Sequence, residues 1–357
     1  MRVLVASLVL FSMIVAHAVD AVPAINALSF TPRQIQAGKD RIARADFEVN
    51  FKSKVTLKVL DEDGGIVAEV SKDCEAGRNQ IAWEIKDNVL FDAPYYYQLE
   101  AVDAAGKKVV YAPRVTDGFK QLPALKVTPD FKSGSIEYQV PQLSMVRTRI
   151  FVNMILIRTL FDWEPRLAGT YKAVWDGLDQ SGNNVLSSGT GFWVRTQGYT
   201  LPENAFFVTG THREMPARSV EKQSEWSANP DLALCYMHAR LPRERRKDPK
   251  INVEFLQADG KTPIDAKPQI PLEVSKPIKV RMTTPADVAQ ALNDERFEVC
   301  VYLDGTMLFE DEDGTVPFTF NFKPENFNPG VHTLTVTAIS SFDHIGVVHR
   351  EIKILAK

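Results

Sequence analysis

The chain has 357 residues, and at about 100 to 200 residues per domain this length allows two to four domains. Hydrophobic residues make up 45% of the chain and charged residues 24%, which is typical of folded globular proteins and excludes disorder along the whole chain. The formal net charge of -3 provides no overall basic field for a polyanion, so nucleic acid is excluded as a principal partner.

Residues 1–21 have the pattern of a secretory signal peptide. Arg2 gives a short positive start, Val3 to Val15 is almost wholly apolar, and Ala16 and Ala18 place small residues where a signal peptidase cleaves. No later segment reaches the roughly eighteen apolar residues that a membrane-spanning helix needs. We therefore expect an extracytoplasmic protein, periplasmic or secreted, without a membrane span.

Residues 22–115 are predicted to form a first β-sandwich. Short runs such as Ala45 to Val49 and Val55 to Val59 alternate apolar and polar residues, and this period of two is the signature of a strand with one buried face. Segments rich in Asp and Gly, such as residues 61–65, separate the runs and favour hairpin turns.

Residues 116–210 repeat this pattern and are predicted to form a second β-sandwich. Gly169 and Trp175 stand at the same separation as Gly77 and Trp83, and each Gly follows an Ala. A repeat of about ninety residues has the size of one immunoglobulin-like domain. We expect both Trp side chains to lie in the cores.

The second unit also carries a more specific motif. It has an Ala168-Gly169 turn, a strand that ends in Trp175-Asp176-Gly177, a polar turn at residues 178–183 and an aromatic strand at residues 192–194. These features resemble the immunoglobulin-like domain named after the flagellar hook-capping protein, which is common in exported bacterial proteins. The first unit departs from the motif, because Glu84 follows Trp83. The resemblance implies an immunoglobulin-like fold and an accessory role, and it does not imply that this chain caps a flagellar hook.

The remainder of the chain is predicted to be a linker and a third β-sandwich. Residues 211–250 contain several prolines and many charges and show no period of two, which indicates an irregular linker. Strand patterns return within residues 251–357, with a short helix expected over Asp287 to Asn293. The predicted fold class is therefore all-β, with tandem immunoglobulin-like β-sandwich domains and an irregular linker.

The linker carries the densest basic cluster of the sequence. Six cations lie between residues 240 and 250 against two acidic residues, so this stretch is a local positive feature on a mildly acidic chain. A charged linker is often simply solvated, but this cluster is the segment we expect to contact an acidic partner. The predicted partner-binding residues are Arg240, Arg243, Arg245, Arg246 and Lys247.

Aromatic side chains give a second hypothesis, a platform for a sugar ring or a peptide. The candidate residues are Trp163, Trp193 and Tyr96. Alternate side chains of a strand point to opposite faces, so Tyr95 and Tyr97 share one face and Tyr96 takes the other. The alternative is that these rings pack in cores and between domains, where large aromatics bury much area.

The sequence contains no convincing catalytic or cofactor motif. Ser340, Ser341, Asp343 and His344 are triad residue types in a row, but no glycine pattern of a nucleophile elbow surrounds either Ser, and a polar loop is the simpler interpretation. No phosphate loop or dinucleotide fingerprint is present in the sequence. The acidic run at residues 310–314 is interpreted as a solvated hairpin tip, with cation binding as the alternative.

These observations predict a non-enzymatic protein without cofactor or metal. We expect an exported scaffold or binding protein of the cell envelope that acts through protein–protein contacts. A carbohydrate-binding module and an accessory subunit of an extracytoplasmic enzyme are the alternatives, and they would require exposed coplanar aromatic rings and a pocket with perturbed titratable groups, respectively.

Overall fold

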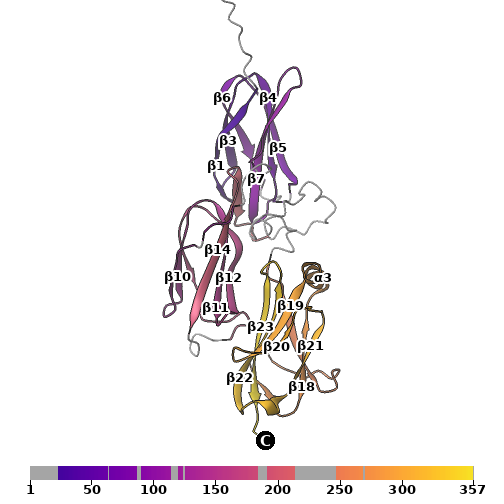
Figure 1. The fold of residues 1–357 in the computed structure, drawn as a ribbon. Helices are drawn as coiled ribbons and strands as arrows, with labels where there is room; N and C mark the ends of the chain where they lie inside the picture. The colour runs from indigo at the N-terminus through magenta and orange to yellow at the C-terminus, as the bar shows by residue number, and fades with distance from the viewer. Residues whose placement is uncertain are drawn as a thin grey trace, which may run out of the picture.

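The computed structural model describes residues 23–62, 64–86, 90–113, 120–123, 125–183, 191–213, 247–267 and 270–356. The predicted signal peptide and residues 214–246 of the predicted linker lie outside these ranges. The described chain is all-β and forms tandem immunoglobulin-like sandwiches, with the third lying beside and below the second (Figure 1). In the described residues, we find no helix whose length and apolar character would suit a membrane span.

The first sandwich consists of two sheets, in the orders β1-β3-β6 and β2-β15-β7-β4-β5, where β15 is Ala205–Thr209, with β8 also paired to β7. The alternation predicted for its strands is confirmed, since Ala43, Ala45, Phe47 and Val49 of β3 are all buried. Its strands are β1 (Ile25–Thr31), β2 (Gln34–Gln36), β3 (Ile42–Val49), β4 (Ser53–Leu60), β5 (Ile66–Cys74), β6 (Gly77–Glu84), β7 (Ala93–Val102) and β8 (Lys108–Tyr111).

The second sandwich has the sheet orders β13-β10-β9 and β12-β11-β14, which correspond to β6-β3-β1 and β5-β4-β7 of the first sandwich. Among the described strands, β2, β8 and β15 of the first sandwich have no counterpart in the second. β6 and β13, which carry the repeated Gly, occupy the same edge position, and Trp83 and Trp175 at their ends are buried. The sequence repeat inferred from the Gly-to-Trp spacing therefore corresponds to a repeat of strand order in the sheets. The strands are β9 (Val127–Asp130), β10 (Ser135–Val140), β11 (Ser144–Val152), β12 (Ile155–Arg166), β13 (Gly169–Val174) and β14 (Phe192–Thr200).

β15 (Ala205–Thr209) follows the second sandwich in the chain but lies in the first. It pairs antiparallel with β7 and parallel with β2. Its Phe206 side chain stacks on Phe30 and Tyr95 in the first core, with ring centroids 4.6 and 5.8 Å away. The predicted domain boundary at residue 210 is therefore corrected: the second sandwich is inserted between β8 and β15 of the first.

In the third sandwich, as in the first, the last strand of the domain pairs parallel with a short strand near its beginning. Its sheets have the orders β16-β18-β21 and β17-β23-β22-β19-β20, and β17 pairs parallel with β23 as β2 does with β15. The predicted short helix is confirmed as α3 (Ala286–Glu295). The other elements are β16 (Asn252–Gln257), β17 (Leu272–Val274), β18 (Ile278–Thr283), β19 (Phe297–Leu303), β20 (Thr306–Asp311), β21 (Phe318–Phe322), η4 (Pro324–Asn326), β22 (Gly330–Ser340) and β23 (Ile345–Ile354).

Candidate functional site: the two junctions between the sandwiches

The first junction is an apolar cluster between the first and second sandwiches. Tyr95 and Tyr97 belong to the first core, whereas Tyr96 on the opposite face of β7 belongs to this junction, as the alternation predicted. Trp163 of the second sandwich lies in the same cluster, with its ring centroid 5.1 Å from that of Tyr199. The buried members of the cluster are Tyr96, Leu143, Met145, Trp163, Tyr199, Leu201, Ala205 and Phe207.

Backbone and side-chain hydrogen bonds also hold the first junction. The Asn204 side-chain amide donates to the Tyr97 carbonyl at 2.7 Å, and the Tyr97 N–H donates to the Asn204 carbonyl at 3.0 Å. Glu203 accepts from Arg33 through its carbonyl and from the Tyr111 hydroxyl through its carboxylate, each at 2.7 Å. Residues 203 and 204 therefore fix the point at which the chain returns to the first sandwich.

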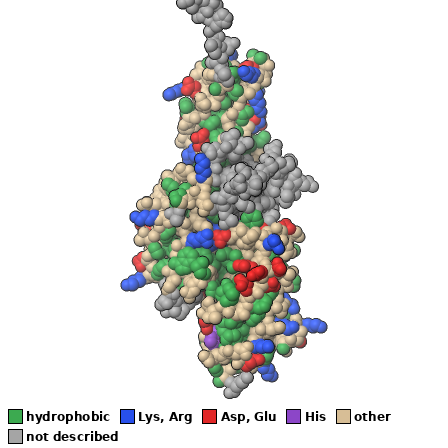
Figure 2. All heavy atoms as spheres, viewed as in Figure 1, with side chains coloured by type: hydrophobic (Ala, Val, Ile, Leu, Met, Phe, Trp, Pro, Cys, Tyr) green, Lys and Arg blue, Asp and Glu red, His purple; other side chains and the backbone are tan. Residues whose placement is uncertain are grey.

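The second junction begins with a smaller apolar cluster between β11, β12 and β23. Phe151 and Leu156 of the second sandwich pack on Ile345 and Val347 of the third. Trp193 is half-buried and stacks on Phe151, with ring centroids 4.5 Å apart and planes 14° apart. Figure 2 shows hydrophobic side chains gathered across the second and third sandwiches, with acidic side chains beside them on the third.

The aromatic platform proposed from the sequence is therefore not formed. Tyr96 is 3% exposed and Trp163 is 7% exposed, and both lie in the first junction. Trp193 lies in the second junction. Large aromatic rings at the ends of neighbouring sandwiches can bury much of their surface against the adjoining domain. The alternative interpretation, packing between domains, is therefore the one observed for these three residues.

Two buried arginines on β11 form the centre of the second junction. Arg147 and Arg149 alternate with core residues, so both guanidinium groups point away from the second core, and each side chain is only 1% exposed. On the same face, Met145 lies in the first junction and Phe151 in the second. One outward face of a single strand thus runs from one junction to the other.

Arg147 is held by the third sandwich and by an aromatic ring. Its Nη2 donates to the Asp343 carboxylate at 2.7 Å and its Nη1 to the Asp343 carbonyl at 3.1 Å. Its guanidinium carbon lies 4.6 Å from the centroid of Trp163, a cation–π geometry. Asp343 sits in the turn between β22 and β23 with φ 60°, a left-handed conformation that Asp tolerates better than most residues.

A β-bulge in β12 places two residues opposite Arg147. The register passes from Val146 paired with Glu164 to Thr148 paired with Phe161, so Asp162 and Trp163 together face one residue of β11. Trp163 has φ 58°, a strained backbone for a bulky residue, and such strain persists only where the surroundings impose it.

Asp248 joins the second and third sandwiches. Its carboxylate forms an ion pair with Arg149 and accepts from the Thr159 hydroxyl at 2.9 Å, both in the second sandwich. The same carboxylate accepts from the Ile345 N–H of the third sandwich at 2.9 Å. Its own N–H donates to the Asp162 carboxylate at 2.8 Å. The end of the predicted linker is therefore a fixed part of the junction.

The charges in this cluster shift one another's titration. Burial, and next the charge of Arg149, lower the pKa of Arg147 to about 10, which leaves it charged at neutral pH. Burial opposes ionisation of Asp248, but the charges of Arg149 and Arg147 outweigh it and lower the pKa of Asp248. Burial, and next the charge of Asp248, raise the pKa of Asp162 to about 6. Asp162 is thus the carboxyl whose ionisation the junction opposes.

We expect Asp162 to make the fold less stable as the pH rises from about 4 to about 6. The folded state holds the Asp162 proton up to about pH 6, whereas the unfolded chain releases it near 3.8, so this stabilisation is complete below pH 3.8 and is lost above 6. A shift of this size corresponds to about 2 to 3 kcal/mol.

The test compares urea unfolding of the wild type and Asp162→Asn at several pH values between 4 and 7. Groups distant from residue 162 titrate in the same way in both proteins, so their contributions cancel in the difference between the two curves. Asn cannot ionise, so Asp162→Asn should gain stability relative to the wild type as the pH rises. Parallel curves would show that Asp162 has an ordinary pKa.

The triad residue types near the C-terminus serve structural roles. Asp343 pairs with Arg147, while the Ser341 hydroxyl donates to the Glu295 carbonyl at 2.5 Å and His344 Nδ1 lies 3.2 Å from the Glu295 carboxylate. Ser340 Oγ accepts a hydrogen bond from the Phe342 N–H at 3.3 Å. The polar loop expected here is confirmed, and its side chains bind α3 and the second sandwich.

Of the predicted basic cluster, only its last residue, Lys247, lies within the described residues. Arg240, Arg243, Arg245 and Arg246 lie outside the described residues, and Lys247 is exposed next to Asp248, whose side chain is 14% exposed. At the other end of the predicted linker, the Thr211 N–H and hydroxyl donate to Asp92 of the first sandwich at 2.8 and 2.9 Å.

Comparison with known proteins identifies no family for this chain. No family model matches the chain, and no curated protein matches it. Among solved structures, the fibronectin(III)-like modules of Clostridium thermocellum CbhA are 10% identical, over 94% of this chain and 94% of that one, with a TM-score of 0.19. A tetra-tandem repeat from the extending region of a large adhesion protein is 12% identical, over 94% of this chain and 75% of that one, with a TM-score of 0.22. TM-scores this low support no inference about function.

Proposed function

We propose that the chain is a non-catalytic, extracytoplasmic scaffold that holds its three sandwiches in a fixed row and acts through protein–protein contacts. The observation that carries this proposal is the second junction, where Asp248 binds Arg149 and Thr159 on one side and Ile345 on the other. Moving the third sandwich away would break these contacts and expose the apolar cluster of Phe151, Leu156, Ile345 and Val347 to water, which is unfavourable. Linked domains usually move relative to one another, so a junction built in this way supports a spacing role.

Three further observations support parts of this proposal. The extracytoplasmic location rests on the signal pattern of residues 1–21. The non-catalytic role is supported by the engagement of Asp343 and Ser341 in structural contacts. Burial of Tyr96 and Trp163 removes two of the three residues on which the carbohydrate-binding alternative rested, and the third, Trp193, stacks on Phe151 in the second junction. The hook-cap resemblance of the second unit agrees with an accessory role but does not name a partner.

The partner is expected to dock on the basic cluster at residues 240–247. The test is crosslinking and affinity purification from the native cell with the wild type and with the combined variant Arg243→Ser, Arg245→Ser, Arg246→Ser. Exposed charges act within a Debye length of about 8 Å at physiological salt, so capture by the wild type should weaken as salt rises. The variant should lose the captured protein while its unfolding free energy stays within about 0.5 kcal/mol of wild type.

Two results would count against this docking site. Capture of the same protein by the variant would place the contact elsewhere on the chain. Unfolding of the variant would show that these arginines stabilise the fold, and the docking hypothesis would then be abandoned.

A further inference from the structure

His349 lies buried between the second and third sandwiches. It sits on the outer face of β23, the face on which Val347 packs against the second sandwich, whereas Val348 packs on the third core. His349 is 2% exposed, and its backbone N–H donates to the Ser181 hydroxyl of the second sandwich at 2.8 Å. The outer face of an antiparallel sheet is commonly solvated, so contact with the second sandwich is what keeps this ring from water.

The contacts of the His349 ring suit a neutral imidazole. Its Nδ1 lies 2.9 Å from the Thr335 hydroxyl of β22, and the Leu156 carbonyl of β12 is within hydrogen-bonding reach of the ring. A neutral imidazole has one donor and one acceptor nitrogen, which match a carbonyl that can only accept and a hydroxyl that can donate. The closed junction therefore accommodates the uncharged form of the ring.

The carboxylate that acts on His349 from the second sandwich is already engaged. Asp179 is fully buried, and its carboxylate accepts from the N–H groups of Ser181 and Asn183 and from the Asn183 side-chain amide at 2.8 to 3.0 Å. Burial lowers the pKa of His349, and the charge of Asp179 and the Leu156 carbonyl offset this effect only in part. The balance keeps the ring neutral while the junction is closed.

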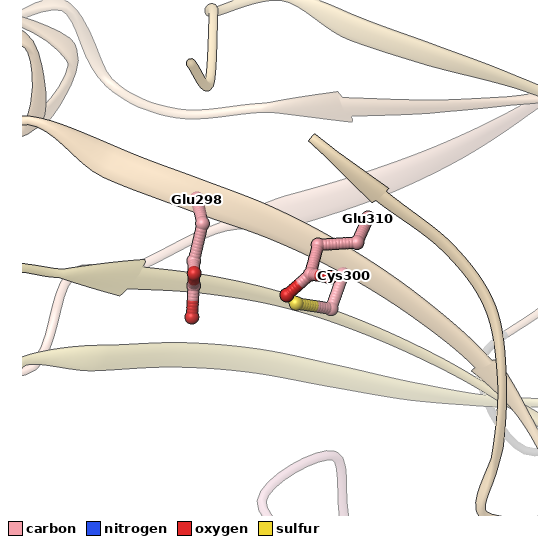
Figure 3. Close-up of side chains that lie close together, drawn as sticks. All are labelled: Glu298, Cys300 and Glu310. Carbon is pink, nitrogen blue, oxygen red and sulfur yellow. The ribbon is translucent and has the colours of Figure 1, made fainter. Parts of the chain in front are cut away.

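The other titratable groups around His349 lie at the margins of the contact. Arg158 of β12 donates to the Asp179 carbonyl at 2.9 Å, and Glu351, which follows on the same face of β23, is partly exposed. On the third sandwich, β22 separates His349 from titratable side chains of β19 and β20 that project to the same side of the sheet. These side chains are Tyr302 and, as Figure 3 shows, Glu298, Cys300 and Glu310.

We propose that acidification opens the second junction through protonation of His349, so that the row of sandwiches is fixed at neutral pH and releases its third member in acid. This inference rests on the fixed row proposed above and adds the condition that ends it. In the open junction the ring reaches water and takes up a proton near its ordinary pKa of 6.5. Proton uptake in the open state alone favours opening, so His349 leaves the junction unaffected above pH 6.5 and weakens it progressively below.

Amide hydrogen exchange at Ile345 tests this proposal, because the Ile345 N–H donates to Asp248 across the junction. The full chain is compared with His349→Gln, whose side chain cannot be charged. Both proteins carry Asp162→Asn, because the Asp162 carboxyl titrates in the same junction with the opposite sign. A group that titrates at 6.5 only in the open state raises the opening constant about tenfold between about pH 7.5 and about pH 5.5. We expect this rise with His349 and not with His349→Gln.

Two further measurements keep the test decisive. The Val336 amide lies in the third core and should stay protected at both pH values, because opening of the junction leaves the third sandwich folded. If His349→Gln does not fold, nuclear magnetic resonance of the His349 ring, identified by its contact with Thr335, should show the neutral form at pH 5.5 in molecules whose junction is closed.

The outcomes separate this proposal from the fixed row on which it rests. Equal protection of Ile345 at both pH values, the same rise in His349→Gln, or a charged ring in the closed junction would overturn the acid-sensitive junction and leave the fixed row standing. An Ile345 amide without protection at neutral pH would overturn both.

Discussion

Asp248→Ala is expected to uncouple the third sandwich from the second. The substitution removes one of the two carboxylate partners of Arg149, whose side chain is 1% exposed and keeps Asp343 at 3.4 Å. Breaking a buried pair from one side costs about 3 to 5 kcal/mol, and we expect the loss to approach that range from below. It also removes the acceptor of the Thr159 hydroxyl and the Ile345 N–H. If the third sandwich detaches, Arg147 and Arg149 become exposed to water. The loss of stability in the variant therefore cannot exceed the free energy that holds the two sandwiches together.

Calorimetry distinguishes this outcome from a general loss of stability. We expect the wild type to unfold with the second and third sandwiches coupled, and Asp248→Ala to unfold with a separate transition for the third sandwich. Asp248→Asn keeps the size of the side chain and should have an intermediate effect. Lys250→Ala, two residues away and exposed, should change stability by less than about 0.5 kcal/mol. A wild-type profile for Asp248→Ala would mean that the ion pair does not hold the junction.

Phe206→Ala is expected to destabilise the first sandwich, although residue 206 follows the second sandwich in the chain. The Phe206 ring is fully buried between Phe30, Tyr95 and Trp83, with ring centroids 4.6, 5.8 and 6.2 Å away. Truncating a core aromatic of this kind costs about 3 to 5 kcal/mol. The whole loss should fall on the domain that β15 completes.

Amide hydrogen exchange locates the loss. Phe206→Ala should speed exchange in β3 and β4 and leave β10 protected, because local opening follows the destabilised unit. Trp175→Ala, which removes a buried ring of comparable size from the second core, should show the reverse pattern. Faster exchange confined to β10 and β11 in Phe206→Ala would contradict the assignment of β15 to the first sandwich.

Local patterns in the sequence were sufficient to predict the strands and the repeat. Alternation in residues 45–49 reports directly which side chains face a core, because the period of a strand is fixed by its backbone geometry. The Gly-to-Trp spacing fixes a strand length between a turn and a core residue, and both Trp83 and Trp175 are buried as expected.

The partners of those strands could not be predicted in the same way. The apolar run Ala205–Val208 is consistent with a buried strand but does not indicate which sheet receives it, so the insertion of the second sandwich was missed. Arg147 and Arg149 have the pattern of a solvated strand face, and only the arrival of the third sandwich buries them. Asp248 lies in a charged, proline-containing stretch, where nothing local distinguishes it from its neighbours. Trp163 faces the junction because of a bulge, which shifts the alternation on which the sequence prediction relied.

The most direct test of a fixed row of sandwiches is the distribution of distances between its first and third members. Spin labels on Glu69→Cys in β5 and Glu325→Cys in η4 occupy exposed positions of those two sandwiches, in a chain that also carries Cys235→Ser. Pulsed electron–electron double resonance should give one narrow distance distribution, and adding Asp248→Ala should broaden it. A broad distribution in the chain that retains Asp248 would contradict the rigid scaffold.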